Sequence, residues 1–255
     1  MPAINVDLVF VIDTSGSMAP CLEKLRKHLN ELINPLQGFV SKIRFGLVAM
    51  SVAPSVGNSH NIYLLQLLSS YGAEALSSIY SPSHNQNDSN EFFTDDPQKL
   101  STILENLVPQ GDENMLVALD IAADMPFGPL SNTKRVIALF SDESFEGGIN
   151  GDANNYIIPQ LIDKLQKRHI QLFVAIPDSD AVQQLSSADR SEIELVDGGQ
   201  GLSGVDFKLL LSQMGKSISG SSLQSVAEPE YQRALFGQDK WVASGKRIDS
   251  SYKDN

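Results

Sequence analysis

Hydrophobic residues in this chain fall into two alternating patterns, which are short, mostly apolar runs and longer stretches with helical spacing. The short runs, most of which contain a single polar or charged residue, predict buried strands, and they cover residues 6–12, 43–50, 62–68, 136–140, 170–176 and 193–196. Between these runs apolar residues recur every three or four positions, which predicts amphipathic helices over residues 18–36, 97–107, 114–125, 156–168 and 205–214. Asp96 and Pro97 mark the start of one helix, and Pro109 and Pro126 each follow the end of one.

The order of these elements predicts the fold class. Strands that alternate with amphipathic helices are typical of βαβ units, which build a mainly parallel sheet with helices on both faces. We therefore expect a Rossmann-like, doubly wound α/β domain. Only a loop separates the runs at 43–50 and 62–68, so we expect one antiparallel edge strand there.

The polar segments predict the domain organisation. Residues 1–216 are expected to form one domain, with a mobile insertion at about 69–94 that is rich in serine, asparagine and glycine and includes SPSHNQNDSN. Residues 217–255 are more polar, with scattered Leu223, Phe236 and Trp241. We expect this C-terminal extension to be either disordered or a docking segment.

Composition narrows the classes of function. The chain has 255 residues, 42% of them hydrophobic, and a formal net charge of −12 at pH 7. This charge argues against nucleic acid or an anionic membrane surface as a partner, because both attract basic proteins. No run approaches the roughly 20 apolar residues of a membrane span, and the first ten residues contain no lysine or arginine as a signal peptide would. We therefore expect a cytoplasmic protein.

The single cysteine, Cys21, excludes an internal disulfide and a multi-cysteine zinc site. It follows Pro20 at the start of a predicted helix, where we expect it to pack in the core rather than to react. The four histidines have no metal-ligand spacing and are expected at the surface or as caps: His28, His60, His84 and His169.

Polar side chains directly follow several predicted strands. The sequence D-T-S-G-S at 13–17 follows the first, S-D-E-S at 141–144 follows a later one, and P-D-S-D at 177–180 follows another, while G-D-E-N at 111–114 opens a helix. Because the carboxyl ends of parallel strands meet at one edge of a sheet, we expect these segments to converge there. Carboxylate and hydroxyl oxygens suit Mg²⁺, Mn²⁺ or Ca²⁺. The sequence thus predicts a divalent-cation site, although Asp178 and Asp180 are better explained as a helix cap.

The D-T-S-G-S motif after an apolar strand, together with I-A-L-F-S-D at 137–142, resembles the von Willebrand factor A (VWA) domain family. The metal-ion-dependent adhesion site (MIDAS) of that family uses D-x-S-x-S, then a threonine, then an aspartate that ends a strand. The resemblance covers about residues 4–216 and implies that Asp13, Ser15, Ser17 and Asp142 hold the metal. In the family, the two serines bind it directly and the aspartates often act through water.

The chain departs from the family at two positions. Glu113, or less favourably Asp112, stands where the family has its threonine, and Ser141-Asp142-Glu143 replaces the family's T-D-G. Both changes add negative charge. We therefore expect Glu113 to bind the metal itself, and the metal to order the loops rather than to act as the main adhesive group.

The resemblance implies a non-enzymatic interaction or adaptor domain that binds a divalent cation, with Mg²⁺ favoured. Intracellular relatives generally serve as subunits of larger assemblies, such as AAA+ ATPase machines, kinase–phosphatase signalling sets, or stress and defence systems. Two alternatives stay open. The D-x-S-x-S motif alone can be a helix cap, and the same acidic rim could serve a metal-dependent phosphohydrolase.

Overall fold

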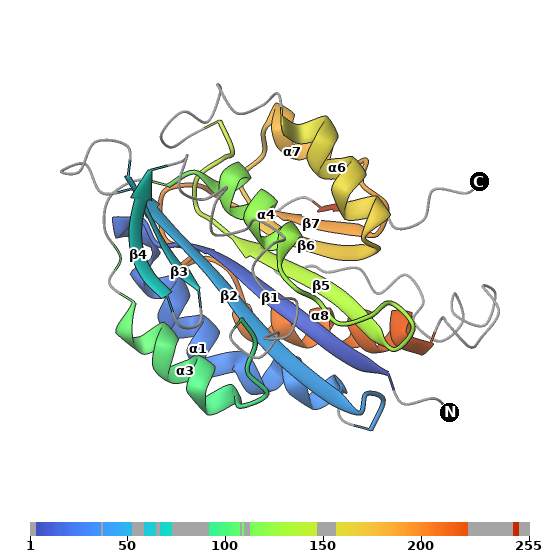
Figure 1. Cartoon of the computed structure of the whole chain (residues 1–255). Helices are drawn as coiled ribbons and strands as arrows, with labels where there is room; N and C mark the ends of the chain where they lie inside the picture. Colours follow the sequence, from blue (N-terminus) through green and yellow to red (C-terminus); the bar gives the residue numbers. More distant parts are fainter. Residues whose placement is uncertain are drawn as a thin grey trace.

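The computed structural model describes residues 4–36, 38–52, 59–64, 67–72, 92–107, 109, 113–146, 157–223 and 247–249. Within these ranges the chain forms an eight-stranded sheet in the order β4-β3-β2-β1-β5-β6-β7-β8 (Figure 1). The strands are β1 (Asn5–Asp13), β2 (Lys42–Val52), β3 (Ser59–Leu64), β4 (Leu67–Gly72), β5 (Thr133–Phe140), β6 (Ile170–Ile176), β7 (Ser191–Leu195) and β8 (Arg247–Asp249). The five central strands, β2, β1, β5, β6 and β7, are parallel.

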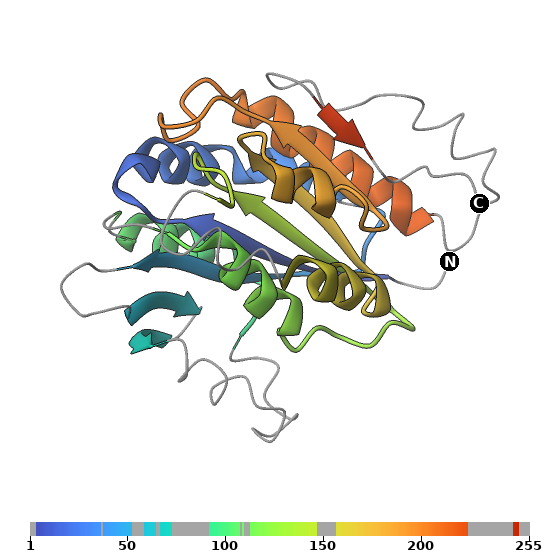
Figure 2. The same ribbon diagram turned by 90° about the horizontal axis from the view of Figure 1, so that it is seen from above.

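Helices cover both faces of this sheet (Figure 2). On one face lie α1 (Ala19–Ile33), α3 (Pro97–Asn106) and α8 (Phe207–Leu223), and on the other lie α4 (Met115–Asp124), α6 (Ile158–Lys167) and α7 (Asp180–Leu185). Two short 3-10 turns flank α1, η1 (Gly16–Met18) and η2 (Asn34–Leu36). The expected doubly wound α/β class is therefore confirmed. No helix in the described part of the chain is both long and apolar enough to cross a membrane.

The sequence of the central strand β1 is almost wholly apolar because helices cover both of its faces. Phe10 and Ile12 face the core beneath α1, α3 and α8, whereas Val9 and Val11 face the core beneath α4, α6 and α7. Its charged residue Asp7 is also fully buried. Two nitrogens of the Arg44 guanidinium donate to its two carboxylate oxygens, each at 2.7 Å, and the Gly128 amide donates at 2.7 Å.

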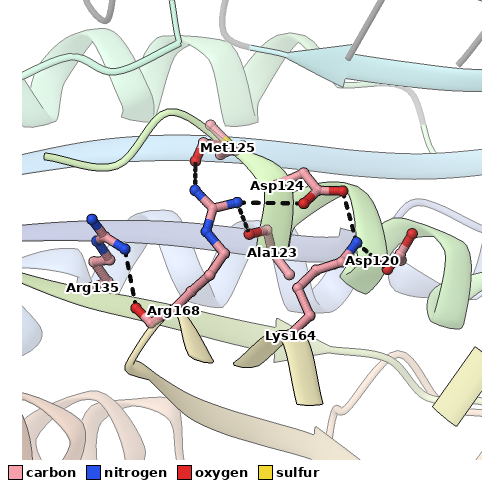
Figure 3. A network of polar contacts seen from close by, with 7 residues as sticks. All are labelled: Asp120, Ala123, Asp124, Met125, Arg135, Lys164 and Arg168. Carbon is pink, nitrogen blue, oxygen red and sulfur yellow. Dashed lines mark hydrogen bonds and ion pairs between the residues drawn. The ribbon is translucent and has the colours of Figure 1, made fainter. Parts of the chain in front are cut away.

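Ion pairs and hydrogen bonds join α4 to α6 on the outer surface of the second layer (Figure 3). Lys164 of α6 pairs with Asp120 at 2.5 Å and with Asp124 at 2.7 Å, both on α4. Arg168, which follows α6, lies 3.4 Å from Asp124. Three acid–base contacts thus neutralise these carboxylates from within the chain.

Arg168 also caps the end of α4. Its guanidinium donates to the carbonyls of Ala123 at 2.5 Å and Met125 at 2.9 Å, and its own carbonyl accepts from Arg135 at 3.1 Å. The Ala123 carbonyl is among those that a helix end leaves without a partner, whereas the Met125 carbonyl also accepts from the Phe127 amide at 2.8 Å. We call the whole set the α4–α6 network: Asp120, Ala123, Asp124, Met125, Arg135, Lys164 and Arg168 (Figure 3).

The structure differs from the sequence expectations at the sheet edges. The run at 62–68, expected to be one strand, is divided between β3 and β4, which pair antiparallel. β3 pairs antiparallel with β2, and β8 pairs antiparallel with β7 at the opposite edge. Antiparallel strands therefore lie on both edges, where the sequence predicted a single one. Apolar runs of this length do not reveal a tight reversal inside them, since the apolar pattern continues through it.

The helices follow the sequence patterns closely, with two exceptions. Asp96 caps α3 by accepting from the Gln98 amide at 2.9 Å, and Asn114 caps α4 by accepting from the Val117 amide at 3.3 Å. The six-residue helix α7 was implied only by the helix cap assigned to Asp178 and Asp180 and was given no range, and α8 continues to Leu223, beyond the expected domain end at residue 216. Residues 73–91, most of the predicted insertion, and residues 224–246 and 250–255 of the C-terminal extension lie outside the described residues.

Candidate metal centre

The loop after β1 brings three oxygen-bearing side chains together at the carboxyl end of the sheet. β1 ends at Asp13, which is fully buried and accepts hydrogen bonds from the Ser15 amide at 2.6 Å and from Ser141 Oγ at 2.9 Å. The hydroxyl oxygens of Ser15 and Ser17 lie 3.2 Å apart. Ser15 is nearly buried, whereas Ser17 is exposed at the start of η1. The D-x-S-x-S motif therefore directs its oxygens to one place.

The loop after β5 delivers the second carboxylate to the same place. Asp142 is fully buried, and its Oδ1 accepts a hydrogen bond from Ser17 Oγ at 2.9 Å. The structure thus brings Asp13, Ser15, Ser17 and Asp142 together, although Ser17 and Asp142 lie 125 positions apart in the sequence. We call these four residues the strand-end site.

Burial gives the strand-end site an unusual electrostatic character. The pKa of Asp13 is raised from its ordinary value of 3.8 to about 6, mainly because burial disfavours the charged form, and the negative charge of Asp142 adds to this effect. Hydrogen bonds from Ser15 and Ser141 act in the opposite direction. Two carboxylates held together in a dry environment are stabilised by a cation more than by any neutral donor.

The donor set fits a small, hard divalent cation. Two carboxylates and two hydroxyls offer only oxygen ligands, which suit Mg²⁺, Mn²⁺ and Ca²⁺. Within the described residues no group of three or more histidine, cysteine, aspartate or glutamate side chains could hold a metal ion. A cation at this place would therefore need the serine hydroxyls as ligands beside the two carboxylates.

Glu113, expected to be the fifth ligand, stands immediately before Asn114, the N-cap of α4, and is 2% exposed. It does not complete a three-carboxylate group with Asp13 and Asp142 within the part of the chain that the structure describes. Coordination by Glu113 stays a prediction. Its alternative, Asp112, lies outside the described residues.

A glycine-rich loop between β7 and α8, residues 197–204, contacts the strand-end site and was not predicted to do so. The Gly201 amide donates to Asp142 Oδ2 at 2.6 Å, and the Gly199 amide donates to the Asp142 carbonyl at 2.8 Å. Gly201 has φ +57°, and a Cβ on it would lie 2.1 Å from the Ser17 carbonyl oxygen. Only glycine fits at this position without a shift of the loop. The sequence D-G-G-Q-G-L-S-G was the available signal.

The polar residues that follow β6, Asp178, Ser179 and Asp180, lie around the start of α7. Ser179, rather than Asp178 or Asp180, caps α7 by accepting from the Val182 amide at 3.3 Å, while Asp178 accepts from the Gln183 side chain at 2.6 Å. The reason is spacing, because the residue before the first helical turn is the serine.

Cys21 lies in α1 and is fully buried in the core beside the site. Burial, and to a lesser extent the charges of Asp13 and Asp142, raise the pKa of its thiol well above the ordinary value. The thiol therefore stays protonated at neutral pH and is not a ready nucleophile.

These observations define a class: a doubly wound α/β domain whose strand-end rim gathers hydroxyl and carboxylate oxygens from separate loops. The model of the von Willebrand factor type A domain family matches residues 7–193, and the chain belongs to this family. VWA domains commonly serve as protein-interaction modules.

Solved structures resemble this chain in fold. The match to the SpRpn10 VWA domain has 13% identity and a TM-score of 0.49, and covers 82% of this chain and 92% of that domain. The match to proximal thread matrix protein 1 of the mussel byssus has 12% identity and a TM-score of 0.50, and covers 84% of this chain but only 49% of that protein. No curated protein matches the chain at a significant level.

Proposed function

We propose that this VWA domain holds a divalent cation at the strand-end site and uses the ordered rim, with its flanking loops, to bind a protein partner. It would act as a non-enzymatic adaptor subunit of a larger intracellular assembly. The observation that carries the proposal is the 2.9 Å hydrogen bond from Ser17 Oγ to Asp142 Oδ1, which brings oxygen ligands from the loop after β1 and the loop after β5 together. Family membership supports the interaction role.

Each residue of the site has a distinct part in this proposal. Ser15 and Ser17 offer hydroxyl lone pairs, Asp13 and Asp142 offer buried carboxylates, and Glu113 adds a carboxylate from the loop before α4. A bound cation, preferably Mg²⁺ and otherwise Mn²⁺ or Ca²⁺, supplies the positive charge that offsets the two buried carboxylates. The Ser141 hydroxyl keeps Asp13 oriented and the Gly201 amide keeps Asp142 oriented, as outer partners of metal ligands do.

The negative charge around the site favours an ordering role over direct adhesion. Glu113 is buried before α4, and Glu143 is exposed directly after Asp142. An exposed glutamate beside the site disfavours a partner that approaches with its own carboxylate. The partner would then contact the flanking loops, and the cation would fix those loops in a single arrangement.

Calorimetric titration tests the cation site and the role of Glu113 together. Mg²⁺, Mn²⁺ and Ca²⁺ are titrated separately into wild type, Glu113→Thr and the double variant Ser15→Ala/Ser17→Ala. We expect saturable binding by wild type, weaker binding by Glu113→Thr, and none by the serine variant. Weaker binding by wild type than by Glu113→Thr would exclude glutamate as a ligand.

The interaction role is tested by capture of partners from native lysate, with and without chelator. Candidates are AAA+ ATPases, kinase or phosphatase components, and stress or defence complexes. A partner weakened both by chelator and by changes in the flanking loops supports the ordering role, whereas a partner lost on chelation but insensitive to changes in those loops supports adhesion through the cation. A partner retained with chelator would show that the interaction needs no cation. Hydrolysis of a generic phosphatase substrate with Mg²⁺ or Mn²⁺, abolished by Asp13→Ala, would instead establish a phosphohydrolase.

A further inference from the structure

Lys24 of α1 contacts the glycine-rich loop at the side away from Asp142. Its ammonium donates hydrogen bonds to the carbonyl of Ser203 and, at 3.3 Å, to the carbonyl of Val205. Lys24 and Ser203 are 179 positions apart in the sequence, and Figure 2 shows the loop, in orange, beside the start of α1, in blue. A side chain of α1 therefore holds the loop from which the Gly199 and Gly201 amides reach Asp142.

The backbone of this loop is costly to hold in one conformation. Four of the eight residues at 197–204 are glycine, which loses more conformational entropy on ordering than any other residue. Gly201 and Leu202 both have φ +57°, a region that leucine rarely adopts. Such a conformation persists only where the surrounding structure holds it. Burial of Leu202 in the core fixes the loop at one residue, and Lys24 fixes it at the next, Ser203.

The contacts of Lys24 close a ring around Asp142. Ser17 Oγ donates to Asp142 Oδ1 at 2.9 Å, and the Gly201 amide donates to Asp142 Oδ2 at 2.6 Å. Ser17 lies in η1, which leads directly into α1, the helix that carries Lys24. Ser203, which accepts from Lys24, comes two residues after Gly201. Lys24 thus joins the two segments that hold the two carboxylate oxygens of Asp142.

We propose that Lys24 is a positioning residue of the strand-end site, which acts on Asp142 through the glycine-rich loop. This role rests on the proposed function, since it concerns the affinity of that site for a cation. Ordering of Asp142 strengthens cation binding, whereas a positive charge in the neighbourhood repels a cation. The ordering effect is the larger one here, because the ammonium is hydrogen-bonded to two carbonyl oxygens, whose negative ends offset part of its charge.

Hydrogen exchange in EDTA tests the contact without any cation. Lys24→Met removes the charge and the donors but keeps an unbranched stem, and Lys24→Arg keeps the charge and the donors. Arg26→Met is the control, because Arg26 lies on the same helix and pairs with Glu105 of α3 at 2.5 Å. We expect exchange of the Gly201 amide to rise by about tenfold in Lys24→Met and to stay near the wild-type rate in the other two variants.

Two outcomes of this measurement overturn the proposal. Unchanged exchange at Gly201 in Lys24→Met would show that the loop does not depend on the lysine. An equal rise in Arg26→Met would assign the effect to weaker packing of α1 in general. Both outcomes are read from metal-free protein, so they hold whether or not the domain binds a cation.

Calorimetric titration with Mg²⁺ tests the consequence for the site. We expect the affinity to fall by about tenfold in Lys24→Met, to be restored in Lys24→Arg, and to be unchanged in Arg26→Met. Tighter binding by Lys24→Met would show that charge repulsion outweighs positioning, and would overturn the proposal. Absence of Mg²⁺ binding by wild type would instead refute the proposed function, and the exchange result would still report on the contact of Lys24 with the loop.

A double-mutant cycle with Gly201→Ala tests whether Lys24 acts through the loop. Gly201→Ala displaces the loop directly, since a Cβ there would lie 2.1 Å from the Ser17 carbonyl oxygen. If both residues act through the same loop, Lys24→Met/Gly201→Ala should bind Mg²⁺ about as weakly as Gly201→Ala alone. Losses of affinity that multiply would show that Lys24 acts on the site by another route and would overturn its assignment as a positioning residue of the loop.

Discussion

Two clusters of carboxylates in this domain differ in their burial and in the groups that contact them. In the α4–α6 network, Asp120 and Asp124 lie within 2.7 Å of the Lys164 ammonium, at the surface. In the strand-end site, Asp13 and Asp142 are fully buried, and the hydrogen-bond donors that reach them within the described residues are hydroxyls and backbone amides.

The difference separates a structural cluster from a candidate binding cluster. Where a chain supplies its own cation, the carboxylates are neutralised and need nothing further. Where it buries carboxylates among neutral donors, the charge is costly unless an external cation offsets it. The contrast predicts that the two clusters respond oppositely to neutralising substitutions.

The largest effect is expected from Asp13→Asn. The amide keeps the size of the side chain and one acceptor for the Ser15 amide, but it removes the charge. We expect Mg²⁺ affinity to fall by about 10- to 100-fold or more, since a loss of this size is typical when a group that supports a metal site is removed. We also expect the rise in melting temperature caused by Mg²⁺ to disappear. Calorimetry and thermal melts measure both. Asp124→Asn, in the α4–α6 network, is the matched control and should leave Mg²⁺ affinity unchanged.

The second prediction concerns pH in the absence of metal. Because the pKa of Asp13 is about 6 in the folded protein and 3.8 ordinarily, the folded state binds more protons than the unfolded state between these values. The free energy of unfolding should therefore fall as the pH rises from about 4 to about 6, by up to about 3 kcal/mol. Urea denaturation in EDTA should give this slope for wild type and a flatter profile for Asp13→Asn. Parallel profiles for the two proteins would contradict the burial of an ionisable Asp13.

The third prediction tests the loop that holds Asp142. In Gly201→Ala, the new Cβ would meet the Ser17 carbonyl at 2.1 Å and the residue would keep φ +57°, so the loop must shift. We expect a loss of about 1–2 kcal/mol in stability and weaker Mg²⁺ binding, by about tenfold. Gly204→Ala in the same loop is the control, because a Cβ there meets nothing within 4 Å. Equal behaviour of the two variants would remove the loop from the site.

The sequence predicted the parts of the fold and site that local patterns encode. The apolar run of β1 leads directly into the D-x-S-x-S motif, and Asp142 likewise comes just after the apolar run of β5. In both places a polar side chain at the end of a strand was visible in the sequence. Gly201 escaped prediction because its role depends on a positive φ and on closeness to Ser17, which only the folded chain creates. The β3–β4 reversal escaped prediction, and α7 was implied only by its cap, because each is shorter than a periodic pattern needs.

The smallest effect is expected from Lys164→Met in the α4–α6 network. Lys164 is 25% exposed and its partners Asp120 and Asp124 are 41% and 42% exposed, so water and salt screen the pairs. We expect a loss of about 1 kcal/mol or less in the free energy of unfolding, smaller still at high salt, with no change in Mg²⁺ affinity. Denaturant titrations at two salt concentrations measure it.

Lys167→Met is the matched control, because Lys167 pairs with Asp163 at 2.7 Å on the same helix with exposed fractions of 73% and 57%. Its expected loss is about 0.5 kcal/mol or less. A Lys164→Met variant that lost Mg²⁺ affinity as well as stability would break the contrast between the two clusters, since charges on α4 would then influence the strand-end site. If only stability changes, the α4–α6 network is structural, and Asp13 and Asp142 remain the carboxylates whose charge the proposed cation would offset.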